Sequence, residues 1–171
     1  MKIIQNKTAL IIIIGTIFFL FLTSCKNEVT ELSSIEKETA KKEISARINE
    51  IVEGAKQLNI EMAMNPYLDS KDFLIINADG SSLDYSGMKE MNSESFKQMN
   101  VLKFTTINEK FRFLTKNKVL LTWFGKNELE LKSGEKMKIE SYTGTMLFEK
   151  INNEWSIVYA HESASQPQLE E

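Results

Sequence analysis

The chain has very few of the residues that build metal centres and disulfide frameworks. Its 171 residues include one cysteine, Cys25, and one histidine, His161. A structural zinc site takes four ligands, mostly Cys and His, and an internal disulfide takes two cysteines. A structural zinc site of this kind and an internal disulfide are therefore excluded, and we expect no metal and no cofactor.

Glycine and excess positive charge are also scarce. Seven glycines are spread along the chain, and none belongs to a Gly-rich loop of the kind that holds a phosphate. The 21 basic residues are outnumbered by 24 acidic ones, which gives a net charge of −3. Without a phosphate-binding loop, we do not expect a nucleotide enzyme. A nucleic-acid backbone is bound by a basic patch or stripe, so we do not expect a nucleic-acid-binding protein either.

One long apolar run is present, near the amino terminus. Lys2 and Lys7 precede residues 9–22 (ALIIIIGTIFFLFL), and the run ends in Leu-Thr-Ser-Cys. A positive start, an apolar segment and small residues before a cleavage point form a secretory signal. The run is shorter than the roughly 20 apolar residues of a membrane span. The alternatives, a transmembrane anchor and a plain signal peptide, leave the lone Cys25 of an exported chain without a role.

The Leu-x-Ser-Cys ending resembles the lipobox of bacterial lipoproteins, in which the cysteine is acylated and becomes the new N-terminus. The resemblance implies that residues 1–24 are removed as a signal peptide and that Cys25 is lipidated. It implies an envelope protein anchored in a membrane, the outer membrane more than the inner one, because Lys26 stands where aspartate favours inner-membrane retention. Residues 25–33 are polar and short, and we expect a tether.

The region after the tether begins with a helical pattern. Ser33-x-x-Glu36 is a capping box, which marks a helix start. An apolar stripe at helical period follows, made of Ile44, Ile48, Ile51, Val52, Ala55 and Leu58. It predicts a long amphipathic helix that ends near Asn65-Pro66. A short strand over residues 72–77, a turn at Asp79-Gly80 and a second helix over residues 86–100 are expected next.

The carboxyl-terminal half has strand character. Four runs, residues 101–114, 118–131, 136–151 and 154–163, are separated by short turns rich in Asn, Gly, Ser and Lys. Short turns between long strands predict an antiparallel meander. Helices followed by one antiparallel sheet form an α+β fold, with the helix stripe against one face of the sheet. We expect one domain over residues 34–165 and a C-terminal tail over 166–171.

The last strand carries a family resemblance. It reads Glu154-Trp-Ser-Ile-Val-Tyr-Ala-His-Glu-Ser163, and its tryptophan, branched aliphatic and His-x-Ser resemble the closing strand of NTF2-like domains. The similar group is the SnoaL-like and calcium/calmodulin-kinase-association-like branch, which Trp123 and Tyr142-Thr-Gly-Thr145 also resemble. The resemblance covers about residues 33–165 and implies a strongly curved sheet, wrapped into a cone around a pocket. Its members include isomerases, cyclases, dehydratases and non-enzymatic binding or dimerising modules, so the fold alone does not decide the function.

Three side chains are candidates for chemistry: His161, Asp84 and Glu140. His161 is the only side chain with an ordinary pKa near neutrality. On a regular strand it shares a face with Trp155 and with every second residue between them, and this face lines either the cone or its outer surface. In an enzyme, His161 would act with a carboxylate such as Asp84 or Glu140, but the three residues form no recognisable acid–base motif.

The expected ligand pocket is largely aromatic. We place Tyr67, Phe73, Trp123, Tyr142 and His161 around it. Apolar and aromatic walls with a few polar groups are typical of sites for small hydrophobic molecules. The same residues could also simply fill a packed core, and the sequence leaves both readings open.

These observations predict a lipid-anchored, NTF2-like lipoprotein of the cell envelope. We expect a non-catalytic module that binds a small hydrophobic ligand or a partner protein. The alternative is a small acid–base enzyme of the isomerase or hydratase type, using His161 and a pocket carboxylate. A third hypothesis is a homodimer joined through the sheet, as the resemblance implies for many relatives.

Overall fold

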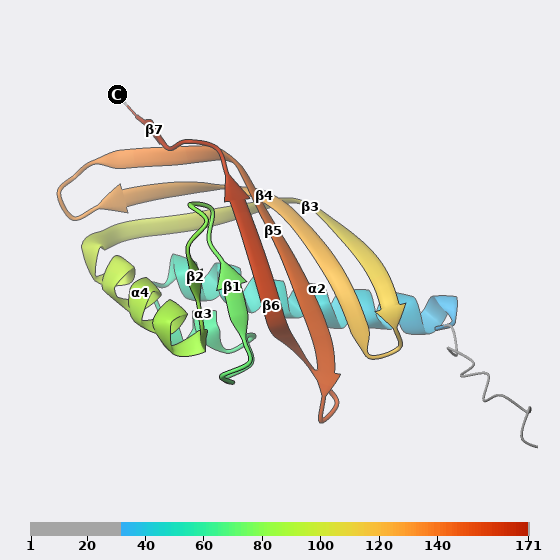
Figure 1. Ribbon diagram of the computed structural model, residues 1–171. Coiled ribbons are helices and arrows are strands. Elements are labelled where there is room, and N and C mark those ends of the chain that lie inside the picture. Colours follow the sequence, from blue (N-terminus) through green and yellow to red (C-terminus); the bar gives the residue numbers. More distant parts are fainter. Residues whose placement is uncertain (1–31, 171) are drawn as a thin grey trace, which may run out of the picture.

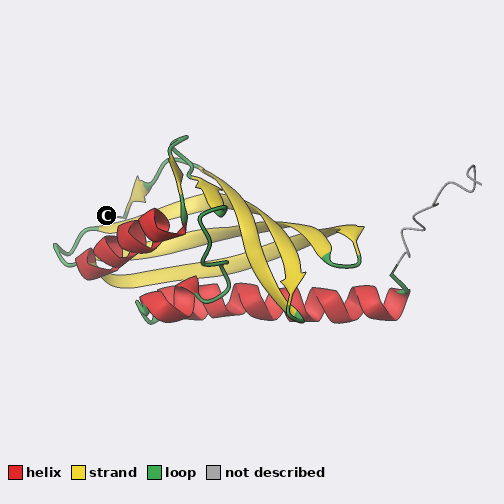
Figure 2. Cartoon of the chain, turned by 60° about the horizontal axis from the view of Figure 1, so that its bottom comes forward, coloured by secondary structure: helices red, strands yellow, loops and turns green. Residues whose placement is uncertain are grey.

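The computed structural model describes residues 32–170, which form a curved sheet packed against helices (Figures 1 and 2). The expected signal peptide, Cys25 and most of the expected tether lie outside the described residues. Within residues 32–170, no helix is both long and apolar enough to cross a membrane. The α+β class predicted from the sequence is confirmed.

The first helix, α2 (Ser34–Lys56), starts at the predicted capping box. The Ser33 hydroxyl accepts a hydrogen bond from the Glu36 amide at 3.3 Å, and the Glu36 carboxylate accepts one from the Ser33 amide at 2.8 Å. The helix ends nine residues before Asn65, where the sequence pattern placed its end, because Leu58 adopts a left-handed conformation with φ 50°. Asn59 then caps the short helix α3 (Ile60–Met64) by accepting a hydrogen bond from the Met62 amide at 3.1 Å.

Helix α4 and the strands complete the chain. Helix α4 spans Tyr85–Gln98. The strands are β1 (Leu74–Ile76), β2 (Ser82–Leu83), β3 (Met99–Thr115), β4 (Lys118–Leu131), β5 (Lys136–Ile151), β6 (Glu154–Ala164) and β7 (Gln168–Leu169). They are ordered β2-β1-β6-β5-β4-β3, and β7 pairs with β5. The tail expected at residues 166–171 therefore contributes a short strand.

The antiparallel meander predicted for β3, β4, β5 and β6 is present. The expectation of a purely antiparallel sheet is wrong, because β1 pairs with β6 in parallel, with Leu74 opposite Tyr159. Such a pairing joins segments far apart in sequence, so no local pattern indicates it. The parallel pairing brings the helical part of the chain to the edge of the meander.

The core lies between α2 and the concave face of the sheet. Helix α2 runs beneath the strands along most of their length (Figure 2). The buried face of α2 contributes Ile44 and Ile48, which pack against Val119 and Leu121 of β4 and Phe148 of β5. Burial of each such side chain stabilises the fold by about 1.5–3 kcal/mol relative to exposure.

Strand β6 contains a bulge that changes which side chains face the core. Leu147 pairs with Tyr159 and Phe148 pairs with Ile157, so Val158 is an extra residue without a partner on β5. Trp155 and Ile157 point inward before the bulge, while Ala160 is the buried residue after it. The odd spacing between Ile157 and Ala160 shifts the alternation by one residue for the rest of the strand.

Candidate functional site

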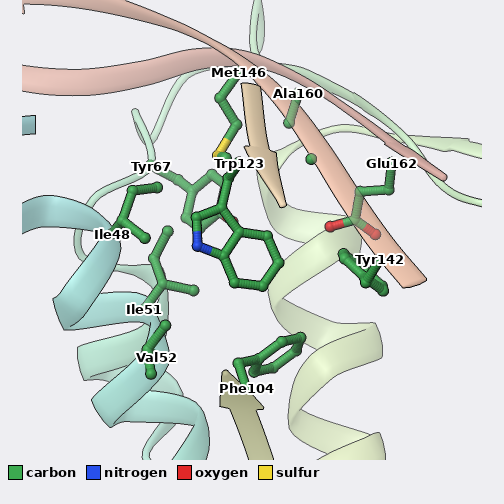
Figure 3. Close-up of a pocket in the computed structure, with 11 residues that line it drawn as sticks. Ile48, Ile51, Val52, Tyr67, Phe104, Trp123, Tyr142, Met146, Ala160 and Glu162 are labelled. Atoms are coloured by element: carbon green, nitrogen blue, oxygen red, sulfur yellow. The ribbon is translucent and has the colours of Figure 1, made fainter. Parts of the chain in front are cut away.

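A cavity lies between α2 and the concave face of the sheet (Figure 3). We call it the inner lobe, and its volume is about 70 Å³. Its lining consists of Ile48, Ile51 and Val52 of α2, Tyr67, Phe104 of β3, Trp123 of β4, Tyr142, Gly144 and Met146 of β5, and Ala160 and Glu162 of β6. The walls are therefore almost entirely apolar or aromatic.

A second cavity, the α4 lobe, adjoins the inner lobe. It has a volume of about 120 Å³ and extends toward Met88, Met91 and Asn92 of α4. The two lobes share the lining residues Ile51, Tyr67, Phe104, Tyr142 and Glu162. Because an engineered apolar cavity of about 150 Å³ accepts benzene, the two lobes together have room for a small organic molecule.

Glu162 is the one charged side chain that lines both lobes. Its carboxylate points toward Tyr142 in Figure 3. Burial raises the pKa of the Glu162 carboxyl above its usual 4.5, and the hydrogen bond with Tyr142 and the nearby His161 only partly oppose this rise. Burial and the Glu162 charge in turn raise the pKa values of the Tyr67 and Tyr142 hydroxyls. The site thus joins a carboxyl that protonates easily to two hydroxyls that stay protonated.

Three aromatic rings stand together in the inner lobe. The ring centroids of Phe104 and Trp123 are 6.1 Å apart, those of Phe104 and Tyr142 are 5.9 Å apart, and those of Trp123 and Tyr142 are 6.1 Å apart. The interplanar angles lie between 69° and 77°. We call this group the aromatic corner, because its three members are close to mutually perpendicular.

The indole of Trp123 is held by two neighbours on the sheet. Its Nε1 donates a hydrogen bond to the Thr106 hydroxyl of β3 at 2.9 Å. Gly125, two residues along β4 on the same face, leaves the space that the ring occupies, since an added Cβ there would overlap the indole. The ring position therefore depends on a glycine and a threonine that no sequence motif marks.

The five residues expected in the pocket are placed differently from one another. Tyr67, Trp123 and Tyr142 line the inner lobe. Phe73 is buried behind it, where its ring packs edge-on against Tyr67 with centroids 5.7 Å apart. His161 is exposed and lines neither lobe.

The position of His161 corrects the face that regular alternation assigned to it. Counting by two from Trp155 puts His161 inside and Glu162 outside. The extra residue Val158 reverses this, so Glu162 enters the cavity and His161 lies on the outer face. No sequence pattern marks Glu162, because the bulge is decided by pairing with β5 and cannot be counted from β6 alone.

The two candidate carboxylates lie outside the cavity. Asp84 is exposed and caps α4, where its carboxylate accepts a hydrogen bond from the Gly87 amide at 2.8 Å. Glu140 is also exposed and pairs with Lys138 at 3.0 Å. Counting by two along β5 would put Glu140 and Tyr142 on one face, but β5 has an extra residue between the pairs Gly125–Tyr142 and Asn127–Ile139. Neither carboxylate approaches His161 through the cavity.

Among residues 32–170, no group of three or more His, Cys, Asp or Glu side chains is arranged to hold a metal ion. The polar groups of the inner lobe are Glu162 and the two tyrosine hydroxyls, with Trp123 Nε1 already bonded to Thr106. This set suits hydrogen bonding and proton transfer to an organic molecule.

Comparison with known proteins identifies the fold. No family model matches the chain, and no curated protein sequence does. Hexachlorocyclohexane dehydrochlorinase LinA type 2 is similar in structure, with a TM-score of 0.71 at 10% identity over 81% of this chain and 94% of that one. A protein from Novosphingobium aromaticivorans, provisionally named a scytalone dehydratase, has a TM-score of 0.73 at 6% identity over 81% and 93%. An NTF2-like superfamily protein from Salmonella enterica has a TM-score of 0.68 at 16% identity over 76% and 94%.

Proposed function

The chain has the NTF2-like fold that these structures share, and on that premise we propose that it is an envelope lipoprotein whose cavity binds a small, largely apolar molecule carrying one polar group. The observation that supports this proposal is the distribution of polar atoms in the inner lobe. Apolar walls surround the space, and Glu162, Tyr67 and Tyr142 supply its hydrogen-bonding groups. In such a site the walls provide affinity and the few polar groups orient the ligand.

The proposed anchoring depends on the amino-terminal sequence. The lipobox resemblance at Cys25 supports a lipid anchor, and Lys26 supports the outer membrane. Metabolic labelling with a fatty acid followed by membrane fractionation tests both. We expect label and membrane association in the native chain and loss of both in Cys25→Ser. Membrane association of Cys25→Ser equal to that of the native chain would contradict the lipid anchor.

The bound-ligand proposal is tested by native purification and mass spectrometry. We expect a chemically uniform small molecule to copurify with the chain. Ala160→Phe, which places a ring in the inner lobe, should abolish this copurification. Tyr159→Phe, one residue away and absent from the lining of either lobe, is the matched control and should retain the molecule. Equal retention by Ala160→Phe would show that the molecule binds elsewhere.

One observation favours a second function, acid–base catalysis. A carboxyl with a raised pKa beside hydroxyl donors in an apolar cavity is an arrangement that removes a proton from carbon and stabilises the developing oxyanion. Glu162 would be the base, and Tyr142 or Tyr67 the hydrogen-bond donor. His161, the catalytic candidate of the sequence analysis, has no part in this proposal. The dehydrochlorinase and dehydratase names among the structural neighbours are consistent with such chemistry in this fold.

Hydrogen exchange at carbon tests the catalytic alternative without a known substrate. Deuterium uptake from D2O into a panel of cyclic ketones is followed by NMR. General acid–base groups contribute about 100- to 10,000-fold to a rate, so Glu162→Gln should slow any catalysed exchange at least about 100-fold. His161→Ala should leave it unchanged. Exchange that persists in Glu162→Gln and disappears in His161→Ala would contradict this assignment.

A further inference from the structure

The aromatic corner brings three aromatic rings to one cavity. Phe104, Trp123 and Tyr142 come from three adjacent strands, and all three line the inner lobe. Their centroids lie 5.9–6.1 Å apart at steep angles, so a guest seated among them lies within about 6 Å of each centroid. The face of an aromatic ring carries negative potential, and a cation within that distance of it is attracted.

The charge of the cavity has the same sign as its ring faces. Glu162 is the only charged side chain in the lining of either lobe, and no Lys, Arg or His joins it there. An anionic ligand would therefore meet a carboxylate and three ring faces without a countercharge. A cation would be attracted by the carboxylate and by any ring face that it contacts.

Glu162 also lacks a cationic partner of its own. None of the ion pairs within residues 32–170 includes it, although other glutamates of the chain, such as Glu43 and Glu128, pair with lysines. Its carboxylate points toward the Tyr142 side chain (Figure 3). A partly buried carboxylate without a countercharge is costly, and a bound cation removes that cost.

We propose that the inner lobe is a site for a methylated ammonium group, held by the aromatic corner and by Glu162 as its counterion. This inference rests on the proposed function, because it names the chemical class of the ligand in the same cavity. The ring faces of Phe104, Trp123 and Tyr142 surround the methyl groups, while the carboxylate balances the charge. The α4 lobe takes the remainder of the ligand.

We infer that the ligand nitrogen is methylated because the inner lobe has few hydrogen-bond acceptors. A primary ammonium carries three N–H donors, each of which needs an acceptor when water is excluded. The inner lobe offers the Glu162 carboxylate and the hydroxyls of Tyr67 and Tyr142, among walls of methyl, methylene and ring atoms. A trimethylammonium group has no N–H to satisfy, and its methyl groups suit the apolar walls.

The test compares two ligands of nearly the same shape and different charge. Choline and its neutral isostere 3,3-dimethyl-1-butanol are titrated into the full chain in lipid nanodiscs, with heat of binding as readout and empty nanodiscs as the blank. We expect choline to bind at least tenfold more tightly than the alcohol. Glu162→Gln should reduce this preference to the part that the aromatic rings supply, and its matched control Glu140→Gln, exposed and outside both lobes, should keep it in full.

A second variant tests the rings separately from the carboxylate. Phe104→Leu keeps an apolar side chain in the corner but removes one ring face, and should weaken choline more than the alcohol. Phe124→Leu, which lines neither lobe, should change neither. Binding of the alcohol as tight as that of choline overturns the cation inference and leaves the small-molecule cavity standing. Binding of neither compound also overturns it, and the proposed function is then judged by the copurification experiment alone.

Discussion

Gly125 and Glu162 are the two residues on which the geometry of the cavity depends most directly. An added Cβ at Gly125 would overlap the Trp123 indole and approach the Thr105 carbonyl oxygen to 2.7 Å. Glu162 places a carboxyl among rings and methyl groups, where its charged form is disfavoured. Gly125 thus leaves the space that the Trp123 ring of the aromatic corner occupies, and Glu162 supplies the carboxyl group beside that corner.

Gly125→Ala should destabilise the protein and disturb Trp123. Overpacking of a well-packed interior typically costs about 1–3 kcal/mol, and the indole has to move because the Thr105 backbone cannot. Chemical denaturation followed by tryptophan fluorescence measures both effects. Gly144→Ala is the matched control, since its Cβ would meet only the flexible end of Met146, at 3.2 Å. An equal loss of stability in the two variants would contradict the special role of Gly125.

The raised pKa of Glu162 predicts a pH dependence of stability. The folded state binds this proton more tightly than the unfolded state, so stability from Glu162 is present below about pH 4.5 and is lost as pH rises through the folded pKa. Glu162→Gln removes the titration. We therefore expect the Tm of Glu162→Gln minus that of the native protein to increase from pH 4 toward pH 8. A constant difference across that range would contradict the raised pKa.

At the scale of elements, local patterns predicted the fold better than the site. The capping box located the start of α2, and β4 and β5 begin and end at the predicted residues. The helix was predicted to continue past Leu58, because Leu58 extends the apolar stripe. In the structure Leu58 adopts the left-handed conformation that ends α2. The parallel pairing of β1 with β6 depends on residues far apart in sequence.

The residues of the site were predicted only in part, because strand β6 contains a bulge. Trp123 could be placed because β4 alternates regularly on either side of it, and Tyr142 because β5 alternates regularly from there toward Phe148. Glu162 could not, since the bulge at Val158 arises from pairing between β5 and β6. Regular alternation from Trp155 therefore put His161 in the pocket, where the structure has Glu162.

Deletions within β6 test this account of the bulge. Removing Val158 leaves the pairs Leu147–Tyr159 and Phe148–Ile157 intact, so Glu162 should stay in the cavity and the copurifying ligand should be retained. Removing Ser156, which pairs with Glu149, puts Trp155 next to Ile157 in sequence and forces one of these buried side chains outward. We expect that loss to cost about 3–5 kcal/mol in urea denaturation. Similar destabilisation by both deletions would contradict the bulge assignment.

At the scale of the whole molecule, the convex face of the sheet, opposite α2, has no helix over it among residues 32–170 (Figure 2). It carries half-buried apolar and threonine side chains: Leu120, Thr122 and Phe124 of β4, and Thr143, Thr145 and Leu147 of β5. His161 of β6 lies exposed beyond them. The homodimer expected from the family resemblance would use this face, and it remains a proposal.

Substitution on the convex face tests the dimer. Phe124→Glu should convert a dimer to monomers at micromolar concentration, because it places an unpaired charge in a shared apolar surface. Sedimentation velocity gives the mass of each species. Glu140→Gln, a change on an exposed and already polar side chain, should leave the dimer intact. A native chain that sediments as a monomer at high concentration would contradict the proposal.

The bulge at Val158 has a consequence for aligning this chain with its relatives. Seven positions separate Trp155 from Glu162, an odd interval, whereas a regular strand returns to the same face only at even intervals. A relative without the extra residue would present its inward side chain six or eight positions after the tryptophan. An ungapped alignment anchored on the tryptophan would therefore match the inward residue of such a relative, six positions on, with His161 rather than with Glu162. Alignments anchored on the tryptophan should be checked for that gap before any functional residue is transferred.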